Sequence, residues 1–117
     1  FALNYGSRAE ILTAVQALYE ELSASGEALP ELTEDMLGTH LMTGFLPNAL
    51  RDPELVIRTS GEERISNFLL WQIAYSELFF TKALWPDFDS ALLEDAIGSF
   101  QQRNRRFGGL KTKEEEE

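Results

Sequence analysis

Apolar residues recur at helical spacing in the first part of the chain. After Ser7 they return every three or four positions: Ile11, Leu12, Val15, Leu18, Tyr19 and Leu22. Ser7 and Glu10 have the spacing of a capping box, in which each side chain accepts a hydrogen bond from a backbone amide of the first turn. The pattern predicts an amphipathic helix from Ser7 to a stop near Gly26, entered from the end of a strand at residues 1–4.

A second, shorter helix is predicted after Thr33. Thr33 is a suitable N-cap residue, and Glu34 and Asp35 place negative charge at the positive end of the helix dipole. Residues 44–53 read GFLPNALRDP and contain two prolines, so they predict a loop.

The pattern changes at residues 54–57, ELVI, a short apolar run that is typical of a strand buried in a parallel sheet. A helix capped by Ser66 is predicted over the following NFLLWQIAY, and a further strand over ELFFTKALW. Asp89 would cap a last helix that carries Leu92, Leu93, Ala96, Ile97 and Phe100. This helix is predicted to end in Arg103, Arg105 and Arg106, with Gly108 and Gly109 just past its last turn. The predicted class is α/β, with a mostly parallel sheet flanked by helices.

Composition narrows the range of functions. The 117 residues, 44% of them hydrophobic, suffice for one domain; we assign residues 1–110 to it and 111–117 to a disordered acidic tail. The net charge of −10 argues against nucleic-acid binding. The absence of cysteine excludes disulfides and thiolate metal sites and fits a cytoplasmic location. His40 is the only histidine, so a multi-histidine metal site within the chain is excluded.

The start of the chain predicts that it is a piece of a longer protein. It begins Phe1-Ala2-Leu3-Asn4, without an initiator methionine or a polar lead-in. No apolar run approaches the roughly 20 residues that a membrane-spanning helix needs.

Candidate chemistry gathers in the loop after residues 54–57. In open α/β sheets, ligands bind beyond the carboxyl ends of the strands. This loop holds two arginines with hydroxyl and glycine neighbours: Arg58, Thr59, Ser60, Gly61, Arg64 and Ser66. Guanidinium forks, hydroxyls and a glycine backbone suit a phosphate or diphosphate. The alternative is that Arg58 and Arg64 pair with Glu62 or Glu63 on a surface loop.

Glu77 lies in a strongly apolar stretch and is a second candidate. It is expected on an exposed edge or buried beside a partner, which would be an arginine or a divalent cation. Aromatic residues are frequent in the same part of the chain, and they predict core packing or, failing that, a subunit interface. They are Phe68, Trp71, Tyr75, Phe79, Phe80, Trp85 and Phe88.

Four sequence blocks together resemble the C-terminal half of the cis-prenyltransferase family, which includes undecaprenyl diphosphate synthases. They read NYGSR, RDPELVIRTSGEERISNFLLWQIAYSELFF, LWPDF and RNRRFGG, and they cover nearly all of residues 3–109. The resemblance implies an enzyme that adds isopentenyl diphosphate to an allylic diphosphate such as farnesyl diphosphate. It further implies cis-polyprenyl diphosphate products such as the cell-wall lipid carrier, a Mg²⁺ requirement, and a homodimer in the cytoplasm at the inner membrane surface.

The resemblance also implies roles for individual residues. Arg58, Arg64 and Ser66 match the residues that bind the diphosphate of isopentenyl diphosphate. Glu77 matches a glutamate associated with Mg²⁺ and the dimer interface. The motif that reaches toward the partner's active site is matched by Arg106 and Gly108.

The sequence departs from the family pattern in three places. The family's NYGGR reads NYGSR here, and Glu63 stands where some members have histidine, so we assign it no role. The H-x-x-D-G-N-x-R-W-A block, with its Mg²⁺-binding aspartate, is absent. The chain would therefore hold no catalytic residue of its own and would work with an N-terminal half. The alternatives are a non-catalytic subunit of a heteromeric prenyltransferase and a plain anion-binding α/β module.

Overall fold

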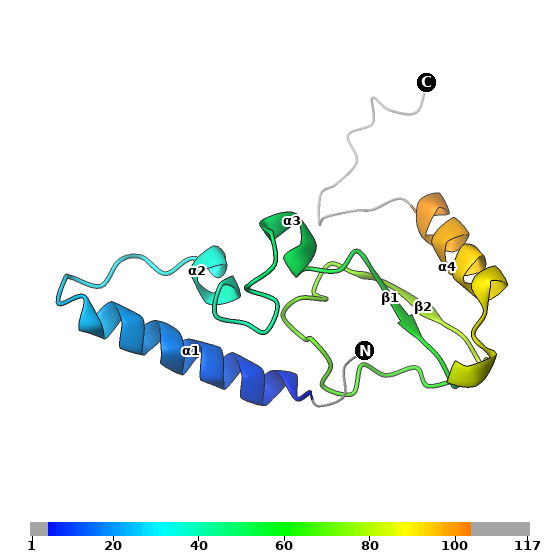
Figure 1. Ribbon diagram of the computed structural model, residues 1–117, viewed down its shortest axis with the longest axis horizontal. Helices are drawn as coiled ribbons and strands as arrows, with labels where there is room; N and C mark the ends of the chain where they lie inside the picture. Colours follow the sequence, from blue (N-terminus) through cyan, green and yellow to red (C-terminus); the bar gives the residue numbers. More distant parts are fainter. Residues whose placement is uncertain (1–4, 104–117) are drawn as a thin grey trace, which may run out of the picture.

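The computed structural model describes residues 5–103 (Figure 1). Its elements, in chain order, are α1 (Ser7–Ala24), α2 (Glu34–Gly38), α3 (Asn48–Arg51), β1 (Leu55–Arg58), β2 (Glu77–Phe80), the 3₁₀ helix η1 (Trp85–Asp87) and α4 (Ser90–Gln102). The two strands pair in parallel, so the predicted α/β class with a parallel sheet is confirmed. The strand predicted at residues 1–4, the acidic tail, Arg106 and Gly108 lie outside the described residues.

The sheet fixes which residues share an edge. Leu55 pairs with Glu77, and Arg58 pairs with Phe80. Because the strands are parallel, the carboxyl ends of both meet at one edge, and the amino ends meet at the other. The helix α4 runs beside this sheet, whereas α1 extends away from it (Figure 1).

The capping box predicted for α1 is wrong. Gly6 occupies the N-cap position, and no side chain caps the helix. The Ser7 hydroxyl instead accepts a hydrogen bond from the amide of Leu70 (2.8 Å). The Glu10 carboxylate accepts from the amide of Met42 (2.8 Å) and from the Gln72 side chain (2.9 Å). Both side chains are buried, and burying a polar side chain without a hydrogen-bond partner costs more free energy than leaving a helix end uncapped.

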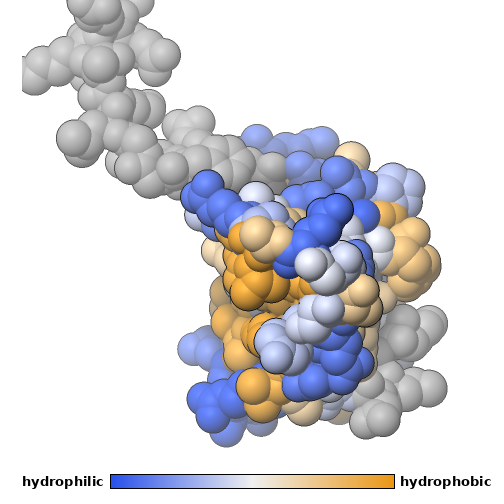
Figure 2. Space-filling model, turned by 90° about the vertical axis from the view of Figure 1, so that its left-hand side faces the viewer, coloured by the Kyte–Doolittle hydropathy of each residue, from blue (hydrophilic) through white to orange (hydrophobic). Residues whose placement is uncertain are grey.

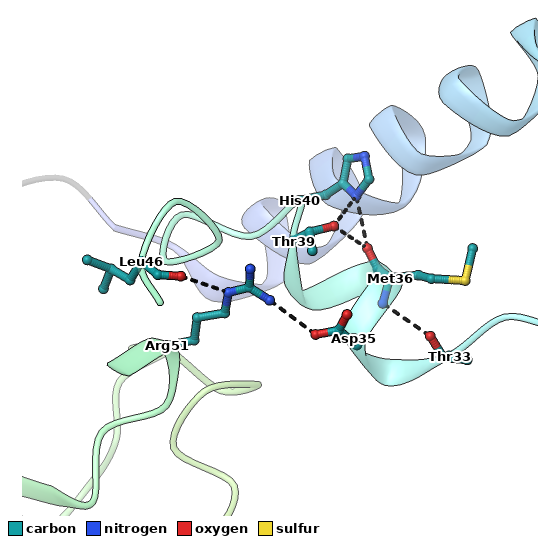
Figure 3. A network of polar contacts seen from close by, with 7 residues as sticks. All are labelled: Thr33, Asp35, Met36, Thr39, His40, Leu46 and Arg51. Carbon is teal, nitrogen blue, oxygen red and sulfur yellow. Dashed lines mark hydrogen bonds and ion pairs between the residues drawn. The ribbon is translucent and has the colours of Figure 1, made fainter. Parts of the chain in front are cut away.

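The second helix is confirmed, with Thr33 as its N-cap: its hydroxyl accepts from the amide of Met36 (3.2 Å). The loop prediction for residues 44–53 missed the single turn of α3, which follows Pro47. At the end of that turn, Arg51 donates to the Leu46 carbonyl (3.1 Å) and to Asp35 (3.1 Å), as Figure 3 shows. These distant partners fix a turn that sequence patterns alone do not indicate.

The helix predicted from Ser66 is also wrong, and residues 66–76 form a series of turns. Ser66, Asn67 and Leu69 have φ angles of 54°, 61° and 45°, which lie in the left-handed region and interrupt a right-handed helix. Asn67 ties this segment to the start of α1. Its carbonyl accepts from the Ser7 amide (2.9 Å), and its side chain accepts from the Arg8 amide (3.0 Å).

The strand β2 and the helix α4 are confirmed as elements, but both are shorter than predicted: β2 covers only Glu77–Phe80 of the predicted ELFFTKALW, and α4 ends at Gln102, before the arginines that were expected in its last turn. Asp89 caps α4 as predicted, because its carboxylate accepts from the Leu92 amide (3.0 Å). Ala96 of this helix is fully buried.

Among residues 5–103, the buried apolar side chains are few: Ala14, Leu18, Leu41, Ile73 and Ala96. Figure 2 looks onto the end of the molecule at which α1 stops, and it shows hydrophobic side chains at that surface. An apolar groove of about 490 Å³ runs there between α1 and residues 29–37. Large side chains along it, including Tyr19, Leu29 and Leu32, are exposed. In the described part of the chain, none of the helices has the length and apolar character to cross a membrane.

Candidate functional site

The loop after β1 stays attached to the end of β2. The amide of Thr81 donates to the Arg58 carbonyl (2.9 Å), and the amides of Ser60 and Gly61 donate to the carbonyls of Ala83 (2.8 Å) and Thr81 (2.9 Å). Ser60 and Gly61 reach these partners with φ angles of 69° and 71°. The prediction that the glycine backbone contributes donors to an anion is therefore wrong at Gly61, because its amide already has a carbonyl partner.

A cavity of about 220 Å³ opens at this carboxyl edge of the sheet. Arg58 and Arg64 both line it, so the structure brings these two predicted residues together. The rest of its lining is almost entirely apolar: Tyr5, Val56, Ile57, Ile65, Phe68, Ile73, Leu78 and Phe80. We call this space the arginine cavity.

Arg58 is half-buried, and its guanidinium has no hydrogen-bond or ion-pair partner within residues 5–103. Withdrawing a charge from water without a partner is costly. A guanidinium left in this state, beside a cavity, is suited to an anionic ligand with two oxygens to accept its paired donors.

Arg64 is placed differently. Its Nε lies 2.7 Å from the Glu62 carboxylate, and its side chain is 73% exposed. The alternative reading of a surface ion pair thus applies to Arg64 and not to Arg58. Such an exposed pair contributes little free energy, so it competes only weakly with a doubly charged ligand.

Ser66 is exposed and does not line the arginine cavity. It follows Ile65, which does. The structure therefore places the predicted serine next to the cavity, while leaving its hydroxyl outside the lining.

The apolar wall of the cavity was not anticipated from the sequence. Phe80 lies level with Arg58 because the strands are parallel and in this register. Phe68 enters from the turn segment and meets Tyr5 edge to face, with ring centroids 5.1 Å apart. A parallel pairing of residues 55–58 with 77–80 would have indicated Phe80, but no local sequence pattern indicated Phe68 or Tyr5.

Glu77 lies at the other edge of the sheet. It pairs with Leu55, three residues before Arg58, which corresponds to roughly 10 Å along the strand. Its carboxylate lies 2.8 Å from Nη1 of Arg103. Of the two kinds of partner expected for Glu77, the structure shows an arginine.

The described residues do not fit a Mg²⁺ site. Within residues 5–103, no three side chains of the metal-ligating types His, Cys, Asp and Glu come together. The one predicted metal ligand, Glu77, already has a cationic partner. Mg²⁺ is held by carboxylates together with substrate phosphates, and Glu77 lies at the edge of the sheet away from the arginines.

His40 is half-buried and follows α2. Its Nδ1 lies 2.9 Å from the Met36 carbonyl (Figure 3), and its Nε2 lies 2.7 Å from the Glu21 carboxylate. Both ring nitrogens face oxygen acceptors, an arrangement that only the protonated imidazole satisfies fully. The hydrogen bond with the Met36 carbonyl is the largest cause that raises the pKa of His40. Burial lowers the pKa, and the hydrogen bond and charge of Glu21 raise it again, so the pKa lies above its usual value.

Fold and cavity together define an α/β protein with two arginines at the carboxyl edge of a parallel sheet. Residues 1–108 match the family model of undecaprenyl diphosphate synthase, and the chain belongs to this prenyltransferase family. The predicted family is thereby confirmed.

Two curated relatives show the extent of the match. The chain is 69% identical over 117 residues to an isoprenyl transferase of Enterococcus faecalis, covering 100% of this chain and 43% of the relative. It is 56% identical over 110 residues to an isoprenyl transferase of Staphylococcus saprophyticus, covering 94% of this chain and 42% of the relative. The chain thus spans less than half the length of the relatives it matches. These shares measure only extent, so the assignment to the C-terminal half stays a prediction.

Two solved structures resemble the fold. Lavandulyl diphosphate synthase from Lavandula x intermedia, in complex with dimethylallyl diphosphate, has a TM-score of 0.81 and 37% identity over 90% of this chain and 44% of that chain. A probable undecaprenyl diphosphate synthase from Campylobacter jejuni has a TM-score of 0.72 and 32% identity over the same shares.

Proposed function

We propose that this chain supplies the isopentenyl diphosphate site of a cis-prenyltransferase. The enzyme would condense isopentenyl diphosphate with an allylic diphosphate such as farnesyl diphosphate and form a cis-polyprenyl diphosphate. Undecaprenyl diphosphate is the proposed product, because the matching family is described by that synthase.

The observation that carries the proposal is the state of Arg58. Its half-buried guanidinium has no partner among the described residues and lines the arginine cavity. A diphosphate would satisfy its donors, and Arg64 can contribute from the same cavity.

The apolar wall supports a prenyl ligand over a purely polar anion. Isopentenyl diphosphate combines a multiply charged head group with a five-carbon branched hydrocarbon. The cavity lining contains apolar side chains such as Phe68, Leu78 and Phe80 beside the two charged arginines. Burial of the hydrocarbon against such side chains favours binding. A structure similar to this one contains dimethylallyl diphosphate, another five-carbon prenyl diphosphate.

The role of this chain in the reaction is then binding and orientation. The arginines would hold the diphosphate at the carboxyl edge of the sheet, and the apolar wall would direct the hydrocarbon away from water. Fixing a substrate in one orientation lowers the entropic cost of the bond-forming step. Ser66, just outside the cavity lining, is proposed to reach the diphosphate once it is bound.

The remaining parts of the proposal rest on the resemblance alone. They are a Mg²⁺ requirement, a homodimer completed by Arg106 and Gly108, an N-terminal half, and a cytoplasmic location at the inner membrane surface. Because the described residues do not fit a Mg²⁺ site, we derive no step through the metal ion.

The proposal is tested by the binding of isopentenyl diphosphate to the intact protein that carries this chain. We expect Arg58→Ala to weaken binding by about 1.5–3 kcal/mol, or roughly 10- to 150-fold, the usual loss for a hydrogen bond to a charged group. Isothermal titration calorimetry measures this directly.

Arg51→Ala is the matched control. It removes an arginine of the same charge that, unlike Arg58, bonds a carboxylate and a carbonyl and lies outside the arginine cavity. This variant should lose stability and keep its affinity. Equal affinity of Arg58→Ala and the unsubstituted protein would contradict the proposed function.

A further inference from the structure

The end of α4 and the start of β2 meet at one pair of side chains. Nη1 of Arg103 donates to Oε2 of Glu77 (2.8 Å) and to the carbonyl of Leu78 (3.1 Å). The Glu77 side chain is 24% exposed and that of Arg103 is 42% exposed, so water screens the pair only in part. We call it the anchor pair.

Arg103 is fixed at both of its ends. It is the C-cap residue of α4, and its amide donates to the Phe100 carbonyl (3.2 Å). One guanidinium nitrogen therefore links the last turn of the helix to two consecutive residues of the strand. A cation in this position also interacts favourably with the negative end of the helix dipole.

The same geometry argues against a metal at Glu77. A Mg²⁺ ion on its carboxylate would have to displace Arg103, which already balances its charge at 2.8 Å. It would also lie at the amino edge of the sheet, three positions along the strand from Arg58.

We propose that Glu77 is a positioning residue that docks the C-terminal end of α4 on the sheet through Arg103, and that it does not bind Mg²⁺. Arg106 and Gly108 follow Arg103 within five positions of the sequence. The anchor pair thus sets the point from which the chain continues toward these two residues. Only the part that concerns enzymatic Mg²⁺ dependence rests on the proposed function.

Hydrogen exchange in metal-free buffer tests the anchor directly. The intact protein is measured by mass spectrometry in EDTA as the unsubstituted form and as Glu77→Gln, Arg103→Ala and Gln102→Ala. Gln102 is the exposed neighbour of Arg103 and serves as the matched control. The readout is the exchange of peptides from the last turns of α4, against peptides from the middle of α1.

The anchor account expects Glu77→Gln and Arg103→Ala to accelerate exchange at the end of α4 by a similar factor, roughly threefold to tenfold. Gln102→Ala and the α1 peptides should keep the original rates. Unchanged exchange in Glu77→Gln and Arg103→Ala would overturn the proposal, and so would an effect that appears only when Mg²⁺ is added.

If Arg103→Ala accelerates exchange throughout the molecule, the substitution has destabilised the whole fold. The experiment is then repeated with Arg103→Lys in its place. Its single ammonium group can reach Glu77 but lacks the planar fork, so we expect an intermediate acceleration confined to α4. Exchange of Arg103→Lys at the original rate would again overturn the anchor.

The Mg²⁺ dependence of enzyme turnover distinguishes a positioning role of Glu77 from a role as a metal ligand. The Mg²⁺ concentration that gives half-maximal prenyl transfer should be the same within about twofold in Glu77→Gln and Arg103→Ala. A tenfold increase in Glu77→Gln alone would make Glu77 a metal ligand and overturn the proposal. Absence of any prenyl transfer by the unsubstituted protein would contradict the proposed function, and the exchange experiment would still decide the anchor.

Discussion

Charged residues lie at both edges of the β1–β2 sheet, but they differ in whether they have a partner. At the carboxyl edge, Arg58 lines a cavity and has no polar partner for its guanidinium in the described chain. At the amino edge, Glu77 and Arg103 satisfy each other at 2.8 Å. The sequence analysis treated Arg58 and Glu77 as two separate candidates, the first for binding a diphosphate and the second for binding Mg²⁺ at the dimer interface. The structure separates a charge that is open to a ligand from a charge that holds two elements together.

This difference shows that the type of a charged residue indicates its function less well than whether its side chain already has a partner in the protein. A buried charge needs an opposite charge or hydrogen bonds, and what remains unsatisfied is available to a ligand. This distinction between the two edges leads to testable effects on stability and on ligand binding, the largest of which concerns stability.

The first prediction concerns Gly61, in the loop that joins Arg58 to Arg64, which we expect to matter for stability and not for ligand binding. Gly61 has a φ of 71°, and a methyl group there would meet nothing closer than 3.8 Å. Gly61→Ala should therefore lower the free energy of unfolding through backbone strain alone, by about 1–2 kcal/mol. Chemical denaturation measures the loss.

Gly98 in α4 gives the matched control for that prediction. It has open space around it and no positive φ. Gly98→Ala should raise the free energy of unfolding by about 0.5–1 kcal/mol, because alanine favours helix. Similar destabilisation by both substitutions would show that strain at Gly61 is not the cause.

Arg64 should contribute less to binding than Arg58, because it is exposed and already paired with Glu62. Arg64→Ala is expected to weaken isopentenyl diphosphate binding by no more than about 1 kcal/mol. Glu62→Gln releases Arg64 and should strengthen binding slightly in the same calorimetric titration. Weaker binding by Glu62→Gln would contradict the view that this ion pair competes with the ligand.

The smallest effect concerns pH and a contact remote from both edges. The Met36 carbonyl and Glu21 raise the pKa of His40 in the folded protein. This contact should stabilise the fold fully below the unfolded pKa of about 6.5 and be lost as pH rises through the higher folded pKa. Because Glu21 is exposed, the contribution should stay under about 1 kcal/mol.

The difference in unfolding free energy between the unsubstituted protein and His40→Gln, measured by denaturation at pH 5.5 and pH 8, tests this prediction. The difference should shrink at the higher pH. A difference that grows with pH would mean that His40 is neutral in the folded state.

Features that depend on neighbouring residues could be predicted from the sequence. The caps Thr33 and Asp89, the parallel strand before Arg58, and the joining of Arg58 and Arg64 at one edge all follow from short-range patterns. The residues that carry the family resemblance also pointed to the family that the comparison shows.

Features that depend on residues far away in the chain could not be predicted from the sequence. Ser7 and Glu10 have the spacing of a cap, yet they bond residues about sixty positions away. Ser66 looks like a helix start, yet the turn segment is fixed by contacts between Asn67 and α1. Placing Glu77 at the edge opposite Arg58 required the strand register, which the sequence did not contain in readable form.

The most direct test of the difference between the two edges is one calorimetric comparison. Isopentenyl diphosphate is titrated into the intact protein, Arg58→Ala and Glu77→Gln in EDTA. The account predicts a roughly 10- to 150-fold loss of affinity for Arg58→Ala and a change within about twofold for Glu77→Gln. Equal losses in both variants, or a loss in Glu77→Gln alone, would contradict it.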